Sequence, residues 1–133
     1  MSTVAIETLT NAVERSWSVE TAAGSGWMES NPAKGQCAVT ACVVQDYLGG
    51  EIIHTDAELP GGGTVSHYFN VIDDELVDLT RQQFPDGTLF SDPMPKREHF
   101  ASTREYCLSY DHTRRRYDVL SGRVAECLAT GDR

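Results

Sequence analysis

An apolar helix in the middle of the chain, predicted over residues 37–48, constrains the fold more than any other feature. Its side chains are broadly apolar, and they include Val39, Val43, Val44, Tyr47 and Leu48. A helix of this kind has to be covered by other elements, because water would otherwise contact most of its surface. Gly49 and Gly50 follow it and provide its C-terminal stop. We therefore expect this helix to be the central buried element.

The segments around this helix predict a single α+β domain over residues 1–133, with helices at both ends and a small antiparallel sheet after the central helix. Further helices are expected at residues 3–17, 103–108 and 113–128. Strands are expected at residues 51–54, 65–72 and 75–80. Glycine, proline and polar residues predict a long loop over residues 18–35, with or without a short helical turn, and irregular structure over residues 85–95.

The overall charge argues against several classes of partner. Twenty acidic residues against eleven basic ones give a net charge of −9, which opposes binding to a nucleic acid backbone. No stretch approaches the roughly 20 apolar residues that span a bilayer, and the first residues do not resemble a secretory signal. We expect a cytoplasmic protein that binds neither nucleic acid nor membrane.

The four cysteines, at positions 37, 42, 107 and 127, form no Cys-x-x-Cys pair and have no close histidine pair beside them. Free thiols are therefore expected, with no metal and no cofactor. A redox or metal role shared by Cys37 and Cys42 is disfavoured because a separation of five residues turns two side chains about 140° apart on a helix.

Cys37 lies where a glycine-containing loop meets the central helix. The first N–H groups of a helix have no internal acceptor, and together with the helix dipole they favour a thiolate. The same groups could hold an oxyanion formed when that thiolate attacks a carbonyl. Cys37 is therefore the candidate nucleophile.

A base and an orienting acid follow in the predicted hairpin. If Ile72 and Glu75 flank a two-residue turn, His67 and Asp78 are diagonal neighbours on one face, and Asn70 is on the other. We therefore predict His67 as the base and Asp78 as the group that orients it. A change of one residue in the turn would favour Asn70 instead. His54 and His99 are the alternative bases.

Other side chains near the cysteine are candidates for an oxyanion hole or a substrate pocket. An amide donor could come from Gln36 or from Asn31, and the sequence does not choose between them. Asn70 is a further candidate for binding the oxyanion or the substrate. Trp27 could form a pocket wall, although an aromatic anchor for the long loop is the more common role. Arg81 could hold a substrate carboxylate or form a surface ion pair.

Several of these motifs together resemble the small bacterial YunG-like proteins. They are Asn31-Pro32 and the segments 35–41, 67–70 and 78–84, and the resemblance covers about residues 27–84. It implies similarity to the papain-like and transglutaminase-like superfamily, in which a helix-start cysteine faces a histidine and an aspartate or asparagine on adjacent strands. A papain-like minimal core is therefore implied, with Cys37, His67 and Asp78 in those roles. Papain-type proteases carry their oxyanion glutamine at the place where this chain has Asn31.

The leading hypothesis is a cysteine-dependent acyl-transfer enzyme, namely an amide or thioester hydrolase, a deamidase or an acyltransferase. The chain is short for a papain-like protease, so a small molecule or a peptide is the expected substrate. The alternative is a non-catalytic binding module in which Cys37 and His67 line a ligand pocket.

Overall fold

The structure is a computed structural model that describes residues 4–130. Its helices are α1 (Ile6–Ser16), α2 (Cys37–Leu48), α3 (Thr103–Leu108) and α4 (Asp111–Ala129). Its strands are β1 (Glu51–Glu58), β2 (Thr64–Ile72), β3 (Glu75–Val77) and β4 (Leu89–Phe90), and single 3₁₀ turns are found at Val19–Thr21 and Arg81–Gln83. The α+β class is confirmed, while residue 3 of the predicted first helix is outside the described residues. Within residues 4–130, no helix has both the length and the apolar character needed to cross a membrane.

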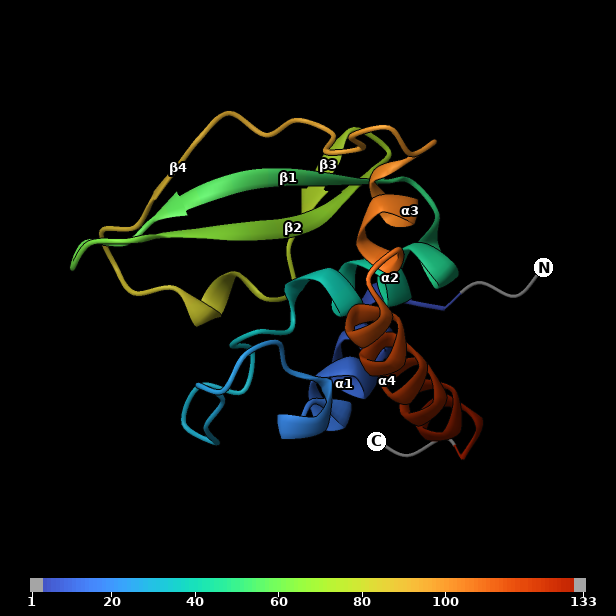
Figure 1. The fold of residues 1–133 in the computed structure, drawn as a ribbon. Coiled ribbons are helices and arrows are strands. Elements are labelled where there is room, and N and C mark those ends of the chain that lie inside the picture. Colours follow the sequence, from blue (N-terminus) through green and yellow to red (C-terminus); the bar gives the residue numbers. More distant parts are fainter. Residues whose placement is uncertain (1–3, 131–133) are drawn as a thin grey trace.

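The four strands form one antiparallel sheet in the order β3-β2-β1-β4 (Figure 1). Asp73 and Asp74 form the turn between β2 and β3, with φ angles of 52° and 67°. Positive φ at both central residues is the conformation of the tight hairpin turn that matches the twist of the strands. Ile72 pairs with Glu75, which confirms the predicted register.

Three parts of the sheet differ from the prediction. Strand β3 ends at Val77 instead of Thr80. Strand β1 continues to Glu58 instead of ending at His54, because its outer half pairs with the first half of β2. Strand β4 falls in the segment predicted to be irregular and pairs with Ala57 and Glu58. A two-residue strand has no periodicity of its own, so only its partner reveals it.

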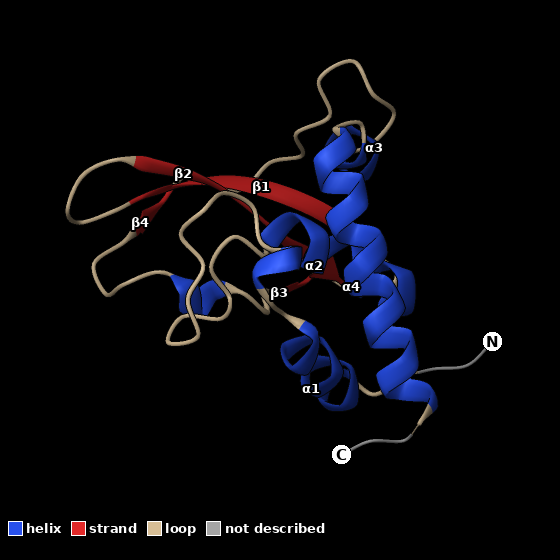
Figure 2. Cartoon of the chain, turned by 60° about the horizontal axis from the view of Figure 1, so that its bottom comes forward, coloured by secondary structure: helices blue, strands red, loops and turns tan. Residues whose placement is uncertain are grey.

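Helix α2 is the centre of the molecule, as the sequence predicts. The sheet is on one side of it, and α1 and α4 are on the other (Figures 1 and 2). Its residues 39–44 are all buried. The larger apolar cluster joins three helices through Leu9, Val13, Val39, Val43, Leu120 and Val124. On the sheet side, Ala41 and Cys42 pack with Ile52 of β1.

Candidate functional site

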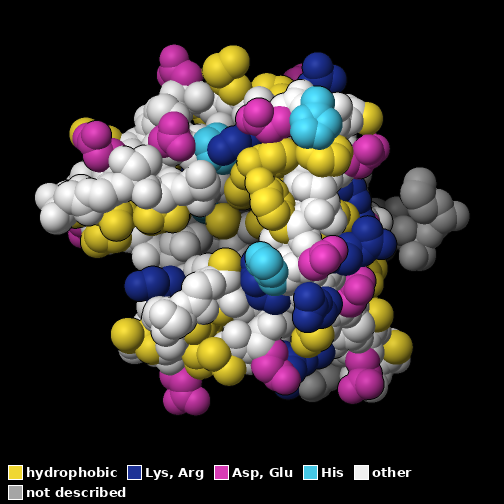
Figure 3. All heavy atoms as spheres, viewed as in Figure 1, with side chains coloured by type: hydrophobic (Ala, Val, Ile, Leu, Met, Phe, Trp, Pro, Cys, Tyr) yellow, Lys and Arg dark blue, Asp and Glu magenta, His cyan; other side chains and the backbone are white. Residues whose placement is uncertain are grey.

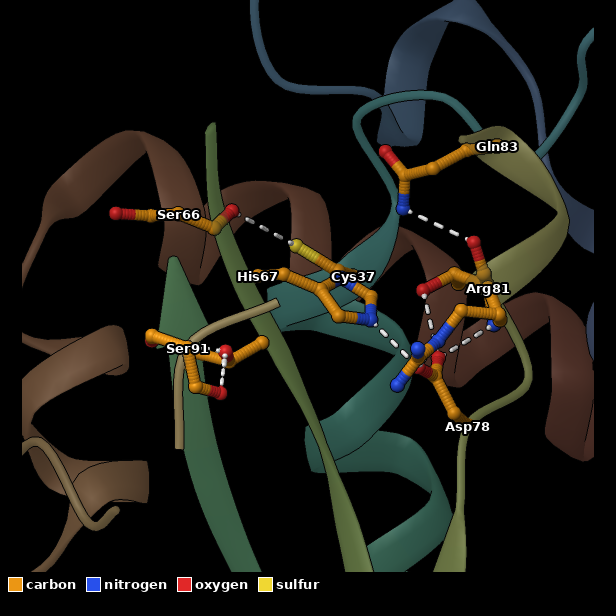
Figure 4. A network of polar contacts seen from close by, with 9 residues as sticks. Cys37, Ser66, His67, Asp78, Arg81, Gln83 and Ser91 are labelled. Carbon is orange, nitrogen blue, oxygen red and sulfur yellow. Dashed lines mark hydrogen bonds and ion pairs between the residues drawn. The ribbon is translucent and has the colours of Figure 1, made fainter. Parts of the chain in front are cut away.

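Three side chains from three parts of the chain meet at the start of α2. Cys37 is the first residue of this helix, His67 is in the middle of β2, and Asp78 follows the end of β3. The His67 Nε2 atom is 2.6 Å from Asp78 Oδ2. The Cys37 thiol is beside the imidazole ring, where it acts electrostatically on it, and it contacts the Ser66 carbonyl oxygen at 3.8 Å (Figure 4). The predicted contact between His67 and Asp78 is therefore present.

The two nitrogens of His67 are in different situations. Nε2 bonds to Asp78, whereas Nδ1 is buried and makes no hydrogen bond to any described residue. A carboxylate at Nε2 keeps a proton on that nitrogen, which leaves Nδ1 able to accept one. The Cys37 thiol is the group beside the ring that could supply it.

The surroundings of His67 favour its protonated form. Burial opposes the charge, but the hydrogen bond to Asp78 and the neighbouring Cys37 outweigh it and raise the pKa of His67 to about 9. The ring is completely buried and packs against Phe69, Phe84 and Phe90, with the Phe84 ring edge-on at a centroid distance of 4.8 Å. These contacts hold the imidazole in place and exclude water from it.

Asp78 is held from several directions. Its Oδ2 atom also accepts a hydrogen bond from Arg81 Nε at 2.8 Å, and its Oδ1 atom accepts one from the Thr80 backbone N–H at 3.2 Å. Burial alone would raise the pKa of Asp78, but His67 and Arg81 together lower it. The Arg81 guanidinium is 3.9 Å from the centre of the Phe90 ring. Arg81 therefore forms an ion pair, which is one of the two roles predicted for this residue from the sequence.

A cavity of about 250 Å³ opens beside Cys37. Cys37, Ala38 and Val39 all line it, and their backbone N–H groups donate no hydrogen bond to any described residue. Figure 3 shows the same face, hollowed between the sheet and the chain segments below it and bordered by hydrophobic side chains. A carbonyl in this cavity could reach both the thiol and these free N–H groups.

The four further candidates from the sequence do not line this cavity. Gln36 is completely buried, and its amide binds Thr21 Oγ1 at 2.7 Å and the Ser18 carbonyl at 3.0 Å. A buried amide needs partners for both its ends, and the 3₁₀ turn supplies them. Gln36 therefore anchors the loop to α2 instead of pointing toward the thiol.

The other three candidates also have structural partners. The Asn31 amide donates to the Gln83 carbonyl at 3.2 Å, and the Trp27 indole donates to the Pro32 carbonyl at 2.9 Å. Trp27 thus has the loop-anchoring role. Asn70 is on the opposite face of β2 from His67, where it donates to the Ala41 carbonyl at 2.9 Å and ties the sheet to α2. The N–H groups at the start of α2 are thus the unpaired donors at this end of the cavity.

Two other histidines and two other cysteines fit the predicted roles less well, although Cys107 also lines the cavity. His54 is 3.7 Å from Asp56, and His99 stacks on Phe100. Burial raises the pKa of Cys42 to about 12 and also raises that of Cys107. Both thiols are inert in this state, since the thiolate is the reactive form.

The sequence did not indicate the far wall of the cavity. Tyr106 of α3 and Tyr110, Thr113 and Arg116, from the start of α4, line it opposite residues of β2. These residues are near or within predicted helices, but nothing in their spacing relates them to Cys37.

These features define an α+β protein in which a cysteine, a histidine and an aspartate cluster together and the cysteine lines a small cavity. The chain belongs to the YunG family, since the model of this family, described as "YunG protein", matches residues 5–129. It is 31% identical over 115 residues to "Uncharacterized protein YunG" of Bacillus subtilis (strain 168), which covers 86% of this chain and 92% of that protein. No solved structure matches the chain significantly.

Proposed function

We propose that the protein is a cysteine-dependent acyl-transfer enzyme with a papain-like minimal core. In this proposal it acts on an amide or thioester of a small molecule or a peptide, as a hydrolase, deamidase or acyltransferase. The observation that carries it is the position of His67 between Cys37 and Asp78, with the 2.6 Å hydrogen bond fixing the ring. The burial of Cys42 and Cys107, two of the three other thiols, supports the choice of nucleophile.

In the proposed reaction, Cys37, His67 and Asp78 act both when the acyl group is attached to the enzyme and when it is released. With the Cys37 proton already on His67 Nδ1 as an imidazolium, the Cys37 thiolate sulfur forms a bond to the substrate carbonyl carbon while the carbonyl oxygen takes the negative charge. The N–H groups at the start of α2 stabilise that oxyanion. The bond to the leaving nitrogen or sulfur then breaks, and the leaving group takes the proton from Nδ1, which leaves a thioester on Cys37.

The second half releases the acyl group. Water or an amine gives a proton to Nδ1 as its oxygen or nitrogen attacks the thioester carbonyl, and the Cys37 sulfur leaves as a thiolate, which restores the starting pair with the imidazolium. Asp78 stabilises the imidazolium in both halves through Nε2 and remains ionised throughout.

Alkylation by iodoacetamide near neutral pH tests the nucleophile, with mass spectrometry following each cysteine separately. Cys127 is an internal control because it is partly exposed like Cys37. We expect Cys37 to react at least about tenfold faster than Cys127, since an imidazolium at its side favours the thiolate. His67→Asn should remove the difference, and His99→Asn, the same change at an exposed histidine, should keep it.

Equal rates at Cys37 and Cys127 in the wild-type protein would refute an activated thiolate. The unfolding midpoint of each variant in urea separates a local effect from loss of the fold. The alternative function, a ligand-binding module, predicts that Cys37→Ser retains ligand affinity while no turnover is found with the wild-type protein.

A further inference from the structure

Arg116 is the only charged residue that lines the cavity beside Cys37 among the described residues. Its Nε atom is buried without a hydrogen-bond partner, and its guanidinium makes one hydrogen bond to the described residues, from Nη2 to Thr113 Oγ1 at 3.1 Å. No carboxylate of residues 4–130 forms an ion pair with it. A partly buried guanidinium without an anion has lost hydration that no protein group replaces.

The charge of the cavity is opposite to that of the protein. The chain carries a net charge of −9, but no aspartate or glutamate lines this cavity. Burial lowers the pKa of Arg116, with no acidic neighbour to oppose the effect. An arginine remains protonated under such conditions, so the cavity presents a positive charge to its contents. A guanidinium in this state is suited to a carboxylate, which can accept two parallel hydrogen bonds from it.

The rest of the cavity limits the size and character of a ligand. Its volume of about 250 Å³ is below the range of roughly 300–1,000 Å³ that is typical for drug-sized ligands. Tyr68, Tyr106 and Tyr110 line it, and the last two have their hydroxyl oxygens 3.3 Å apart. Aromatic rings of this kind pack against an apolar or aromatic body while their hydroxyl groups remain hydrated.

We infer that the cavity binds a small amide or thioester that carries a free carboxylate, with the carboxylate on Arg116 and the reacting carbonyl at Cys37. An acylated amino acid or the C-terminal end of a peptide has this chemistry. Thr113 positions the guanidinium through its hydroxyl group. The inference rests on the proposed function for the reacting carbonyl, whereas the anion site is a separate property of Arg116.

Two pairs of alkylating agents test the anion site. Iodoacetate is compared with iodoacetamide, and N-iodoacetylphenylalanine with its amide, so each pair differs only in a carboxylate. For each reagent, the alkylation rate at Cys37 is divided by the rate at Cys127. Within each pair, this relative rate for the acid is then divided by the relative rate for the amide. We expect this ratio to be about ten for at least one pair, which is the effect of one charge-assisted bidentate contact.

Arg116→Gln should bring the ratio close to one, and Arg116→Lys should retain part of it. Arg115→Gln is the matched control, because it removes the same charge from an exposed neighbour that does not line the cavity. A ratio near one for both pairs in the wild-type protein, or a ratio that survives Arg116→Gln, overturns the inference. Because the ratio compares acid with amide, it is independent of thiol activation, which the iodoacetamide rate alone reports. Failure of the anion site and failure of the proposed function are therefore distinguishable.

Discussion

Replacing Asp78 with asparagine tests the electrostatics of the site most directly. The carboxylate has two acceptor oxygens, one for His67 and Arg81 and the other for the Thr80 N–H. An asparagine of the same shape has only one acceptor oxygen, and its amide nitrogen would face one of these donors. The substitution therefore removes the counter-ion of the imidazolium with little change in volume.

The size of the effect follows from the pKa of His67. Its rise from 6.5 to about 9 corresponds to about 3 kcal/mol of stabilisation of the folded protein. Because the pKa is higher in the folded state, this stabilisation is fully present below pH 6.5 and is lost as the pH rises through about 9. The pKa of Asp78 is lowered, so its own contribution is present above the ordinary carboxyl pKa and is lost as the pH falls.

In Asp78→Asn, only Cys37 still offsets the burial of His67, so the pKa of His67 should fall well below 9. Urea unfolding at roughly pH 6 and pH 9.5 measures the consequence. The wild-type protein should lose up to about 3 kcal/mol more between these conditions than the variant, the full value applying if Asp78 supplies the whole shift. Asp118→Asn, at an exposed ion pair with Arg114, should behave like the wild type.

Titration of the His67 ring by NMR gives an independent reading of the same quantity. An ordinary pKa for His67 in the wild-type protein, or an unchanged one in Asp78→Asn, would refute the argument that Asp78 holds the imidazolium.

Two further substitutions test the structural positions around the site. Gln36→Ala should lower the free energy of unfolding by about 1–3 kcal/mol, because it removes two hydrogen bonds between Gln36 and residues 18–21; urea denaturation measures this, and no loss would contradict the anchoring role. Gly50→Ala should be more destabilising than Gly49→Ala in the same assay. Both glycines have positive φ, but only at Gly50 would the added Cβ meet the backbone oxygen of Val71, so equal losses would contradict the close approach.

The local sequence was sufficient for much of the framework. The bounds of α2 and α3 agree with the prediction, because apolar spacing and end signals act within a few residues. The hairpin turn at Asp73 and Asp74 fixed the register of β2 and β3, and with it the shared face of His67 and Asp78. The contact between these two side chains was predictable for that reason.

The tertiary structure decided which polar groups face Cys37. Gln36 is next to it in the chain, yet it turns inward, because a buried amide must find partners and those are in the 3₁₀ turn of residues 19–21. Arg116 is remote in sequence but lines the same cavity, because α4 packs against α2 in the apolar core.

The sequence by itself therefore determined the order of the helices and of the first three strands, the cysteine at the helix start and the alignment of His67 with Asp78. These depend on backbone preferences and on a period of two residues, which are local properties. The strand β4, the burial of Gln36 and the charge in the cavity depend on segments that meet only when the chain folds, so the tertiary structure alone decided them.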